Sequence, residues 1–187
     1  MKKIPTLFVR DLSTRLVTTF VTDGCEWVLA GEGHATVKFD GTCCLVRGGR
    51  LYKRRELKAN EAPPPDFERV DYDGLTGKVV GWVPVGAGPD DKWHREAWEA
   101  IGMLPDNTYE LMGPKVQGNT RDLSRHLFLG HDIPAGFLAG APITYESLKL
   151  LLSDFSHEGV VWHHDDGRMA KIKRRDFGYD WPIKARL

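Results

Sequence analysis

Two short turns constrain the fold of this chain more than any other feature of its sequence. One is Gly-Gly at 48–49, which separates a β-rich segment over residues 35–47 from its return over residues 50–57. The other is Asp-Gly at 166–167, inside the segment HEGVVWHHDDGRMAKIKRRDFG at residues 157–178. Two-residue turns of these compositions favour tight antiparallel hairpins. The sequence therefore predicts two hairpins within antiparallel sheets.

The middle of the chain predicts two further strands and a loop. GKVVGWVPV at residues 77–85 and TYELM at residues 108–112 have the β-branched and aromatic content that is typical of strands. Residues 59–74 contain three consecutive prolines and several acidic side chains. That composition indicates an exposed loop.

Two segments, 91–103 and 144–155, repeat apolar side chains with helical spacing, and Thr144 suits the N-cap of the second helix. The predicted apolar positions are Trp93, Ala97, Ala100 and Ile101 in the first helix and Leu148, Leu151, Leu152 and Phe155 in the second. Together with the hairpins, these helices predict an α+β fold class with two antiparallel sheets and flanking helices.

The length and composition fit a single globular domain over residues 1–187. Hydrophobic residues make up 41% of the chain, and 26 basic residues balance 26 acidic ones. Without net charge the chain has no global positive field, so an anionic partner must bind at a local basic patch. Three cysteines do not form a disulfide framework, and no apolar run approaches the ~20 residues of a membrane span. We expect a soluble cytoplasmic protein without a signal peptide.

The second hairpin gathers charged side chains on one face. A two-residue turn at 166–167 places Trp162 opposite Lys171 and Val160 opposite Lys173, and side chains alternate along each arm. The face so predicted carries Glu158, Val160, Trp162, Lys171, Lys173 and Arg175. The opposite face carries Val161, Ala170 and Ile172 and is the predicted core side.

The first hairpin brings basic side chains together in the same way. Its turn places Thr42 opposite Arg55 and Cys44 opposite Lys53, and Lys38, Asp40 and Arg55 then share a face. Six of the twelve residues 47–58 and four of the five residues 171–175 are basic. A phosphate group is the obvious partner, although amphipathic hairpins with solvated basic faces show the same pattern.

Lys38 is the unusual basic residue, because it interrupts a β-rich segment in which ATV precedes it and FDG follows it. Burial and neighbouring cations both disfavour an ammonium ion, and a lysine in such surroundings becomes a nucleophile. Lys171 and Lys173 would supply the neighbouring charge if the two hairpins face each other.

Five segments, in order, resemble the motifs of the covalent nucleotidyltransferases, the superfamily of ATP-dependent polynucleotide ligases and GTP-dependent capping enzymes. They are KFDG at 38–41, KRRELK at 53–58, YELMG at 109–113, EGVVW at 158–162 and KIK at 171–173, which are similar to motifs I, Ia, III, IV and V. Within the superfamily they are most similar to RNA ligases, including compact RNA-repair ligases. The resemblance runs from about residue 30 to residue 182 and implies the nucleotidyltransferase (ATP-grasp-like) fold, with a nucleotide cleft between two sheets.

The resemblance implies a three-step reaction on RNA. Lys38 would attack the α-phosphorus of ATP, expel pyrophosphate and hold AMP as a phosphoramidate. AMP would then pass to an RNA 5′-phosphate, and an RNA 3′-hydroxyl would displace AMP to seal the strand. The implied cofactors are ATP and Mg²⁺ or Mn²⁺.

The resemblance also assigns roles to other residues. Glu158 would organise the metal ion, and Lys171 and Lys173 would contact the α-phosphate. The remaining implied nucleotide-binding residues are Asp40 and Gly41 beside the nucleophile, Arg54 or Arg55 at phosphate, with the predicted face favouring Arg55, Glu110 at the ribose hydroxyls and Phe128 stacked on adenine.

The chain departs from the family pattern in two respects. Val37 stands where RNA ligases often have an acidic residue that reads adenine, and the chain ends at Leu187 without an OB-fold or motif VI. The second departure argues against DNA ligases and capping enzymes. Two alternatives remain open: a GTP-dependent capping-type guanylyltransferase, and a non-catalytic module that binds nucleotide or RNA.

Four other residues allow simpler interpretations. Cys43 and Cys44 alternate across a strand, and small buried side chains are a better prediction for them than catalytic thiols. Gln117 and Asn119 fit turn formation, and the resemblance raises the chance that they touch nucleotide.

Overall fold

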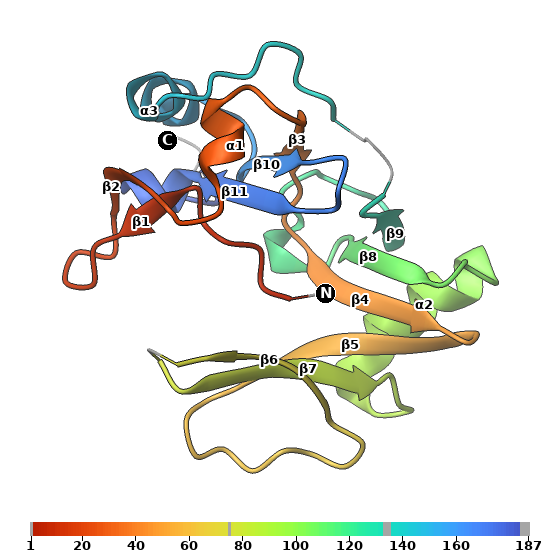
Figure 1. Ribbon diagram of the computed structural model, residues 1–187. Coiled ribbons are helices and arrows are strands. Elements are labelled where there is room, and N and C mark those ends of the chain that lie inside the picture. The colour runs from red at the N-terminus through yellow and green to blue at the C-terminus, as the bar shows by residue number, and fades with distance from the viewer. Residues whose placement is uncertain (1, 75, 133–135, 184–187) are drawn as a thin grey trace. The chain divides into compact units, whose positions relative to one another are not determined.

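The computed structural model describes residues 2–74, 76–132 and 136–183, which form an α+β structure with antiparallel sheets (Figure 1). The described residues divide into two compact units. The first contains residues 2–3 and 40–132, and the second contains residues 4–39 and 136–183. The prediction of one domain over the whole chain stays a prediction. None of the described helices is long and apolar enough to cross a membrane.

The first unit is built on a six-stranded antiparallel sheet with strand order β6-β7-β5-β4-β8-β9. Its hairpin at 48–49 has the predicted register, because Cys44 is paired with Lys53 and Arg47 with Arg50. The strands are β4 (Thr42–Arg47), β5 (Arg50–Leu57), β6 (Glu68–Asp73), β7 (Lys78–Pro84), β8 (Asn107–Met112) and β9 (Leu127–Gly130), and the helices are η1 (Pro89–Asp91), α2 (Lys92–Ile101) and η2 (Gln117–Asn119).

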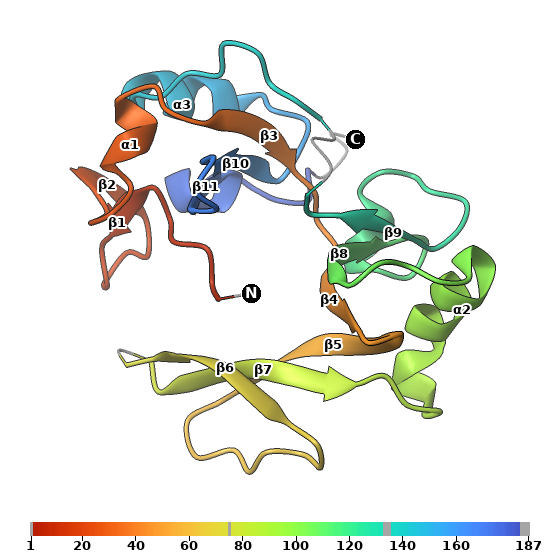
Figure 2. The same cartoon turned by 45° about the vertical axis from the view of Figure 1, so that its right-hand side comes forward.

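The core of this unit lies between the sheet and α2 (Figure 2). The predicted helix exists, but only part of its predicted apolar face is buried. Ala97 is 1% exposed, whereas Ile101 is 47% exposed and Ala100 is also exposed. His94 takes a buried place instead. A helix of ten residues buries only a narrow row of side chains against the sheet. The spacing of apolar residues in the sequence does not show which row that is.

The predicted loop over residues 59–74 is wrong at its end, where Glu68–Asp73 forms β6. This strand lies at the edge of the sheet and pairs with β7 alone. An edge strand tolerates charged side chains because part of it faces solvent. Acidic residues in this segment were therefore compatible with an edge strand as well as with a loop.

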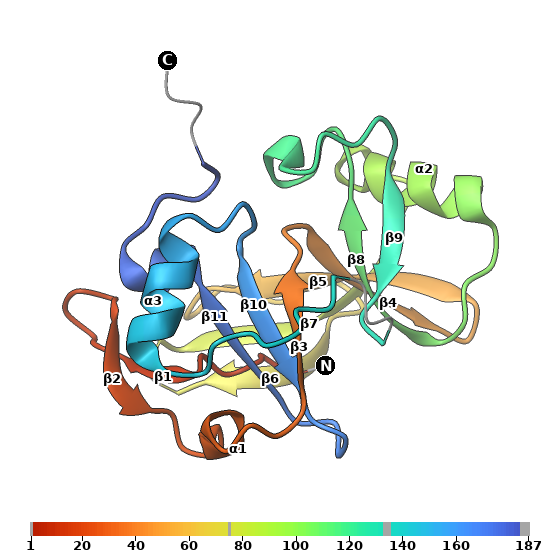
Figure 3. The same ribbon diagram turned by 90° about the horizontal axis from the view of Figure 1, so that it is seen from above.

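The second unit is built on a three-stranded antiparallel sheet with strand order β11-β10-β3 and a separate β1–β2 pair. Its predicted helix is capped by Thr144, whose hydroxyl accepts a hydrogen bond from the Ser147 amide. Leu148 and Leu152 belong to the same hydrophobic core as Val160 and Ile172, and Figure 3 shows α3 beside β10 and β11. The elements are β1 (Phe8–Arg10), β2 (Val17–Val21), α1 (Glu26–Leu29), β3 (His34–Lys38), α3 (Tyr145–Ser153), β10 (Gly159–His163), β11 (Met169–Lys173) and η3 (Arg174–Phe177).

The second hairpin forms, but its predicted register is wrong by one residue. Val161 is paired with Lys171 and Gly159 with Lys173. The turn has three residues between His164 and Arg168, and Gly167 adopts a positive φ of +88° within it. Three-residue hairpin loops place a glycine at this left-handed position. An Asp-Gly pair fits either loop length, so the sequence did not decide between them.

This register changes the predicted faces of the hairpin. Val161 lies on the face of Lys171 and Lys173, whereas Val160 and Trp162 belong to the hydrophobic core and are at most 2% exposed. The predicted positions of Ala170 and Ile172 on the core side are confirmed. Arg175 lies in η3, beyond the end of β11.

The predicted continuous strand over residues 35–47 is in fact two strands. Lys38 ends β3 and is paired with Gly159, whereas Thr42 begins β4 and is paired with Leu111. The predicted common face of Lys38, Asp40 and Arg55 is therefore wrong. β propensity is continuous through this segment, but the strands that each half pairs with are distant in sequence, and propensity does not identify them.

Candidate active site

Three lysines share one face of the three-stranded sheet, and we call it the lysine face. Gly159 of β10 is paired with Lys38 of β3 on one side and with Lys173 of β11 on the other. Side chains alternate along a strand, so Lys171 points to the same side as Lys173. A Cβ atom at residue 159 would lie 2.1 Å from the Ile172 carbonyl oxygen, so the position fits glycine alone.

Glu158 places a carboxylate on the lysine face. Glu158 directly precedes β10, so the alternation of side chains within the strand does not fix its direction. The residue is 8% exposed. Its Oε2 atom lies 2.5 Å from Lys38 Nζ, and its Oε1 atom lies 3.6 Å from Lys173 Nζ. One carboxylate is thus held between two ammonium groups. The structure brings Lys38, Glu158 and both predicted phosphate-binding lysines together.

Lys171 has a strongly lowered pKa. Burial, together with the nearby charges of Lys38 and Lys173, lowers its pKa to about 8. Its backbone is fixed on the outer edge of β11, where its amide donates to the Pro5 carbonyl and its carbonyl accepts from Leu7. This amine therefore loses its proton more readily than an ordinary lysine, on a rigid strand.

Polar side chains continue along the lysine face beyond Lys38. The rings of His34 and His163 stack with 5.2 Å between their centroids. The Thr36 hydroxyl lies 3.0 Å from His163 Nε2. Sequence reasoning missed this row, although the polar alternation of His34, Thr36 and Lys38 along one strand was a usable signal.

The donor set around Glu158 fits a hard divalent cation bound together with substrate phosphate. Mg²⁺ in such sites takes one or two carboxylates, phosphate oxygens and several waters. Glu158 offers a carboxylate, although two lysines compete for it. The three lysines would at the same time hold the phosphate charge.

A second group of polar residues lies on one face of the six-stranded sheet. Cys43 is paired with Glu110 across β4 and β8. The Cys44–Lys53 pairing places Arg54 beside Cys43 on the other side, so Arg54 and Glu110 flank the thiol. Arg55 lies on the reverse face, where it is exposed and bonded to Glu61 at 2.7 Å. Of the two candidate arginines, Arg54 therefore shares the face of Glu110, contrary to the predicted preference for Arg55.

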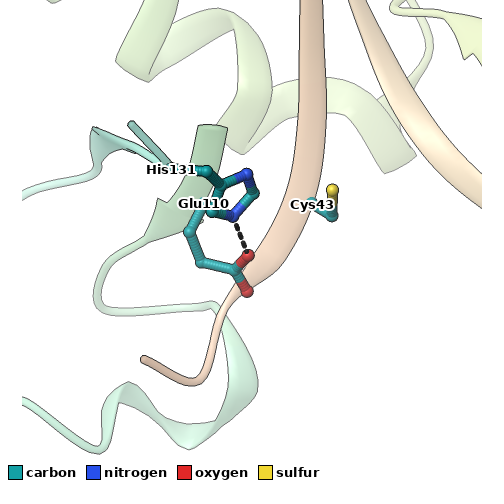
Figure 4. Close-up of side chains that lie close together, drawn as sticks. All are labelled: Cys43, Glu110 and His131. Carbon is teal, nitrogen blue, oxygen red and sulfur yellow. Dashed lines mark hydrogen bonds and ion pairs between the residues drawn. The ribbon is translucent and has the colours of Figure 1, made fainter. Parts of the chain in front are cut away.

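His131 joins this second group, and sequence reasoning missed it (Figure 4). Its Nε2 atom lies 3.1 Å from Glu110 Oε2, and its Nδ1 atom lies 2.9 Å from the Thr108 hydroxyl. Burial and the Glu110 carboxylate raise the pKa of the Cys43 thiol to about 11, although Arg54 opposes the rise. The Cys43 thiol therefore ionises less readily than an ordinary cysteine.

Phe128 does not lie with Glu110. It is 8% exposed and belongs to the core beneath α2, where its ring makes edge contacts with Trp98 and Tyr109. Alternation along β9 sends its side chain away from the face that carries Glu110. This position corrects the predicted stacking on adenine, and Phe128 has a packing role.

The structure also places the remaining predicted residues. Gly41 is required by the sheet, since a Cβ atom there would lie 2.3 Å from the Leu111 carbonyl oxygen. Asp40 beside it is half-buried. Val37 is 8% exposed, and Asn119 stabilises a turn because its amide oxygen accepts from the Leu123 backbone at 2.9 Å. Gln117 has a positive φ of 45° in the same turn.

Comparison with known sequences gives a consistent result. The family described as RNA ligase 1 matches residues 98–187. RNA ligase 1 of Danio rerio is 33% identical, over 83% of this chain and 71% of the fish protein. RNA ligase 1 of Mus musculus is 24% identical, over 80% of this chain and 68% of the mouse protein. RNA ligase 1 of Pongo abelii is 25% identical, over 79% and 68% of the two chains.

Proposed function

Because this chain belongs to the RNA ligase 1 family, we propose that it joins RNA 5′-phosphate and 3′-hydroxyl ends with ATP, through lysyl-AMP and RNA-adenylate intermediates. The observation that carries this proposal is the cluster of Lys38, Glu158, Lys171 and Lys173 on one face of a sheet. A reactive amine, a carboxylate and two further cations are the groups that nucleotidyl transfer needs. The proposal includes the nucleotidyltransferase fold for the whole chain.

In the first step Lys38 is the nucleophile. Its Nζ atom forms a bond to the α-phosphorus of ATP, the bond from that phosphorus to the bridging oxygen breaks, and pyrophosphate leaves with the electron pair. The amine loses its proton to solvent. Lys171 and Lys173 offset the negative charge that grows on the α-phosphate oxygens.

In the later steps AMP moves to RNA and then leaves. An oxygen of the RNA 5′-phosphate attacks the AMP phosphorus, the bond from that phosphorus to Lys38 Nζ breaks, and the nitrogen keeps the electron pair and takes up a proton from solvent. The RNA 3′-hydroxyl then attacks the 5′-phosphorus, loses its proton and expels AMP. Lys38 is the nucleophile in the first step alone, whereas the other cations of the lysine face can neutralise phosphate charge in all three.

We assign Glu158 as the residue that holds Mg²⁺ or Mn²⁺. A bound divalent ion supplies further neutralisation of phosphate charge. Glu158 contributes its carboxylate, and its separation from Lys38 Nζ of 2.5 Å keeps the amine oriented before substrate binds. Phosphate oxygens would supply the other ligands.

In the first unit we assign Glu110 to the ribose hydroxyls and Arg54 to a phosphate of nucleotide or RNA. The support for Arg54 is its position next to Cys43, on the face that carries Glu110. Asp40 and Gly41 keep their assignment from motif I.

Covalent labelling tests the proposed function. The purified chain is incubated with Mg²⁺ and either α-labelled ATP or α-labelled GTP, and the products are separated on a denaturing gel. We expect label from ATP on the wild-type chain and none on Lys38→Arg, which keeps the charge but lacks the nucleophile. Label from GTP alone would reassign the chain to capping chemistry, and folded protein without label from either would contradict the proposal.

RNA joining is the second measurement. A 5′-phosphate RNA and a 3′-hydroxyl RNA are incubated with the wild-type chain, Mg²⁺ and ATP. We expect a joined product that depends on ATP. Labelled protein that never joins RNA would support nucleotidyl transfer but contradict the ligase assignment under these conditions.

A further inference from the structure

Among the described residues, Cys43, Glu110 and His131 form a group whose potential ligand atoms all lie within 4.8 Å of one another (Figure 4). We propose that this group binds a thiophilic divalent cation, for which Zn²⁺ is the natural example. The site goes beyond the proposed function, which uses a hard cation at Glu158 in the other unit.

The donor set is the first reason. Zn²⁺ is bound in proteins by cysteine sulfur, histidine nitrogen and carboxylate oxygen, at about 2.0–2.3 Å. Tetrahedral geometry at those bond lengths puts neighbouring ligand atoms about 3.6 Å apart. His131 Nε2 and Glu110 Oε2 are already 3.1 Å apart, so the movement needed is an approach of the Cys43 sulfur by at most about 1 Å. Three protein ligands leave a fourth position for water.

Rigid placement is the second reason. Cys43 and Glu110 are directly paired across β4 and β8, and His131 directly follows β9 in the same sheet. The backbone amide of His131 donates to the Thr108 carbonyl at 3.0 Å, which extends the pairing with β8. Little backbone ordering is needed for these three side chains to meet.

The orientation of the imidazole is the third reason. His131 Nδ1 lies 2.9 Å from the Thr108 hydroxyl, and Nε2 points toward Glu110. Histidine ligands usually use one nitrogen for the metal while the other bonds a neighbouring oxygen. A hydroxyl both donates and accepts, so Thr108 can accept from Nδ1 when Nε2 binds the ion.

Arg54 is the group that opposes the ion. Its guanidinium acts on the Cys43 thiol and is the cation nearest to it by strand pairing. Half-burial of the three ligands excludes part of the solvent that would screen this repulsion. Replacing Arg54 by a neutral side chain should therefore strengthen metal binding.

Titration with Co²⁺, in the absence of ATP and RNA, tests the site. A cobalt–thiolate bond produces an ultraviolet charge-transfer band that oxygen and nitrogen ligands do not. We expect this band at one equivalent of Co²⁺ in the wild-type chain and its displacement by Zn²⁺. Cys43→Ser should lose the band, His131→Ala should weaken binding at least ~10-fold, and Arg54→Gln should tighten it. Cys44→Ala, on the opposite face of the same strand, is the matched control and should keep it.

Two outcomes would overturn the site. One is a folded wild-type chain, by circular dichroism, that shows no thiolate band. The other is a band that survives in Cys43→Ser, since the metal would then bind elsewhere. Because the readout contains no nucleotide, either outcome leaves the ligase proposal to its own labelling test.

Discussion

The Lys38 amine lies 2.5 Å from the Glu158 carboxylate, although the two residues are 120 positions apart in the chain. β3 and β10 lie side by side in one sheet, and Lys38 is paired with Gly159, the residue after Glu158. Any change to one side chain alters the surroundings of the other. Substitutions at the two positions nevertheless have separable consequences, because the proposed chemistry uses Lys38 as nucleophile in one step alone.

Lys38→Ala should abolish self-labelling and the ATP-dependent joining of 5′-phosphate RNA. The same variant should retain some joining of RNA that is already 5′-adenylated, because that step needs no lysine nucleophile. One gel with the two substrates measures both activities. Lys38→Arg is the control for charge.

Two results would contradict this prediction. If Lys38→Ala still labels itself with AMP, another residue is the nucleophile. If wild type joins neither substrate, the ligase assignment itself is wrong.

Glu158→Gln should slow adenylation by ~10²-fold or more, because it removes a negative charge from the site at which metal and phosphate charge are balanced. Glutamine keeps the size of the side chain and can still bond one lysine. Single-turnover labelling over a range of Mg²⁺ concentrations measures the effect. An unchanged rate and unchanged Mg²⁺ dependence would remove Glu158 from the mechanism.

The sequence predicted the elements of the candidate site better than their partners. Both hairpins were predictable from turn chemistry, and the register of the first followed from Gly48 and Gly49. The register of the second was missed by one residue, since Asp-Gly allows a two-residue or a three-residue loop. Because of this error, Trp162 was predicted on the face of Lys171 and Lys173, whereas its side chain is buried in the core.

Long-range pairing was the other limit. β3 and β4 are separate strands because Lys38 is paired with Gly159 and Thr42 with Leu111. The residue types between them do not predict this break. His131 was missed for the same reason, because it meets Glu110 through the pairing of β8 with β9. Phe128 was misassigned because its face of β9 depends on the same pairing.

Zn²⁺ should compete with ATP if both proposed sites are correct. Glu110 cannot bind the ribose hydroxyls while its carboxylate ligates a metal. Self-labelling in excess Mg²⁺ should therefore be inhibited by Zn²⁺ in the wild-type chain, and at least ~10-fold more Zn²⁺ should be needed in Cys43→Ser. Equal inhibition of the two proteins would place the inhibitory ion elsewhere.

His94 should make the first unit sensitive to acid. It is 9% exposed, and both ring nitrogens lack a hydrogen-bond partner among the described residues. Burial lowers its pKa below 6.5, with Asp91 opposing and Lys53 adding to the effect. The folded chain therefore favours the neutral imidazole. As pH falls from about 6.5 through the folded-state pKa, the unfolded chain binds the proton more readily, and the free energy of unfolding decreases.

His94→Met removes this titration while filling a similar volume. We expect the variant to lose less unfolding free energy than wild type between pH 7 and pH 5, measured by urea denaturation. Removing an unsatisfied buried group should also leave it at least as stable at pH 7. A wild-type pH dependence that the variant reproduces unchanged would exclude His94 as the acid-sensitive group.

Lys171 should reduce the stability of the fold while serving the proposed reaction. Its pKa of about 8 lies below the ordinary lysine value of 10.5, chiefly because of burial. Each pKa unit corresponds to about 1.4 kcal/mol, so at neutral pH the ammonium opposes folding by a few kcal/mol at most. Lys171→Met should therefore raise the unfolding free energy by about 1–2 kcal/mol at pH 7, and it should slow adenylation.

The pH dependence identifies the cause. Between pH 8 and pH 10.5 the unfolded chain still binds the Lys171 proton while the folded chain has released it, so wild-type stability rises relative to the variant. Urea denaturation of both proteins at pH 7, 8, 9 and 10 should show a difference that is constant up to about pH 8 and then shrinks.

Lys173→Met is the matched control on the same strand. Its amine lies 3.6 Å from Glu158, so we expect no stabilisation there. A less stable Lys171→Met variant at pH 7, or a difference that persists at pH 10, would show that the buried charge is not what opposes folding.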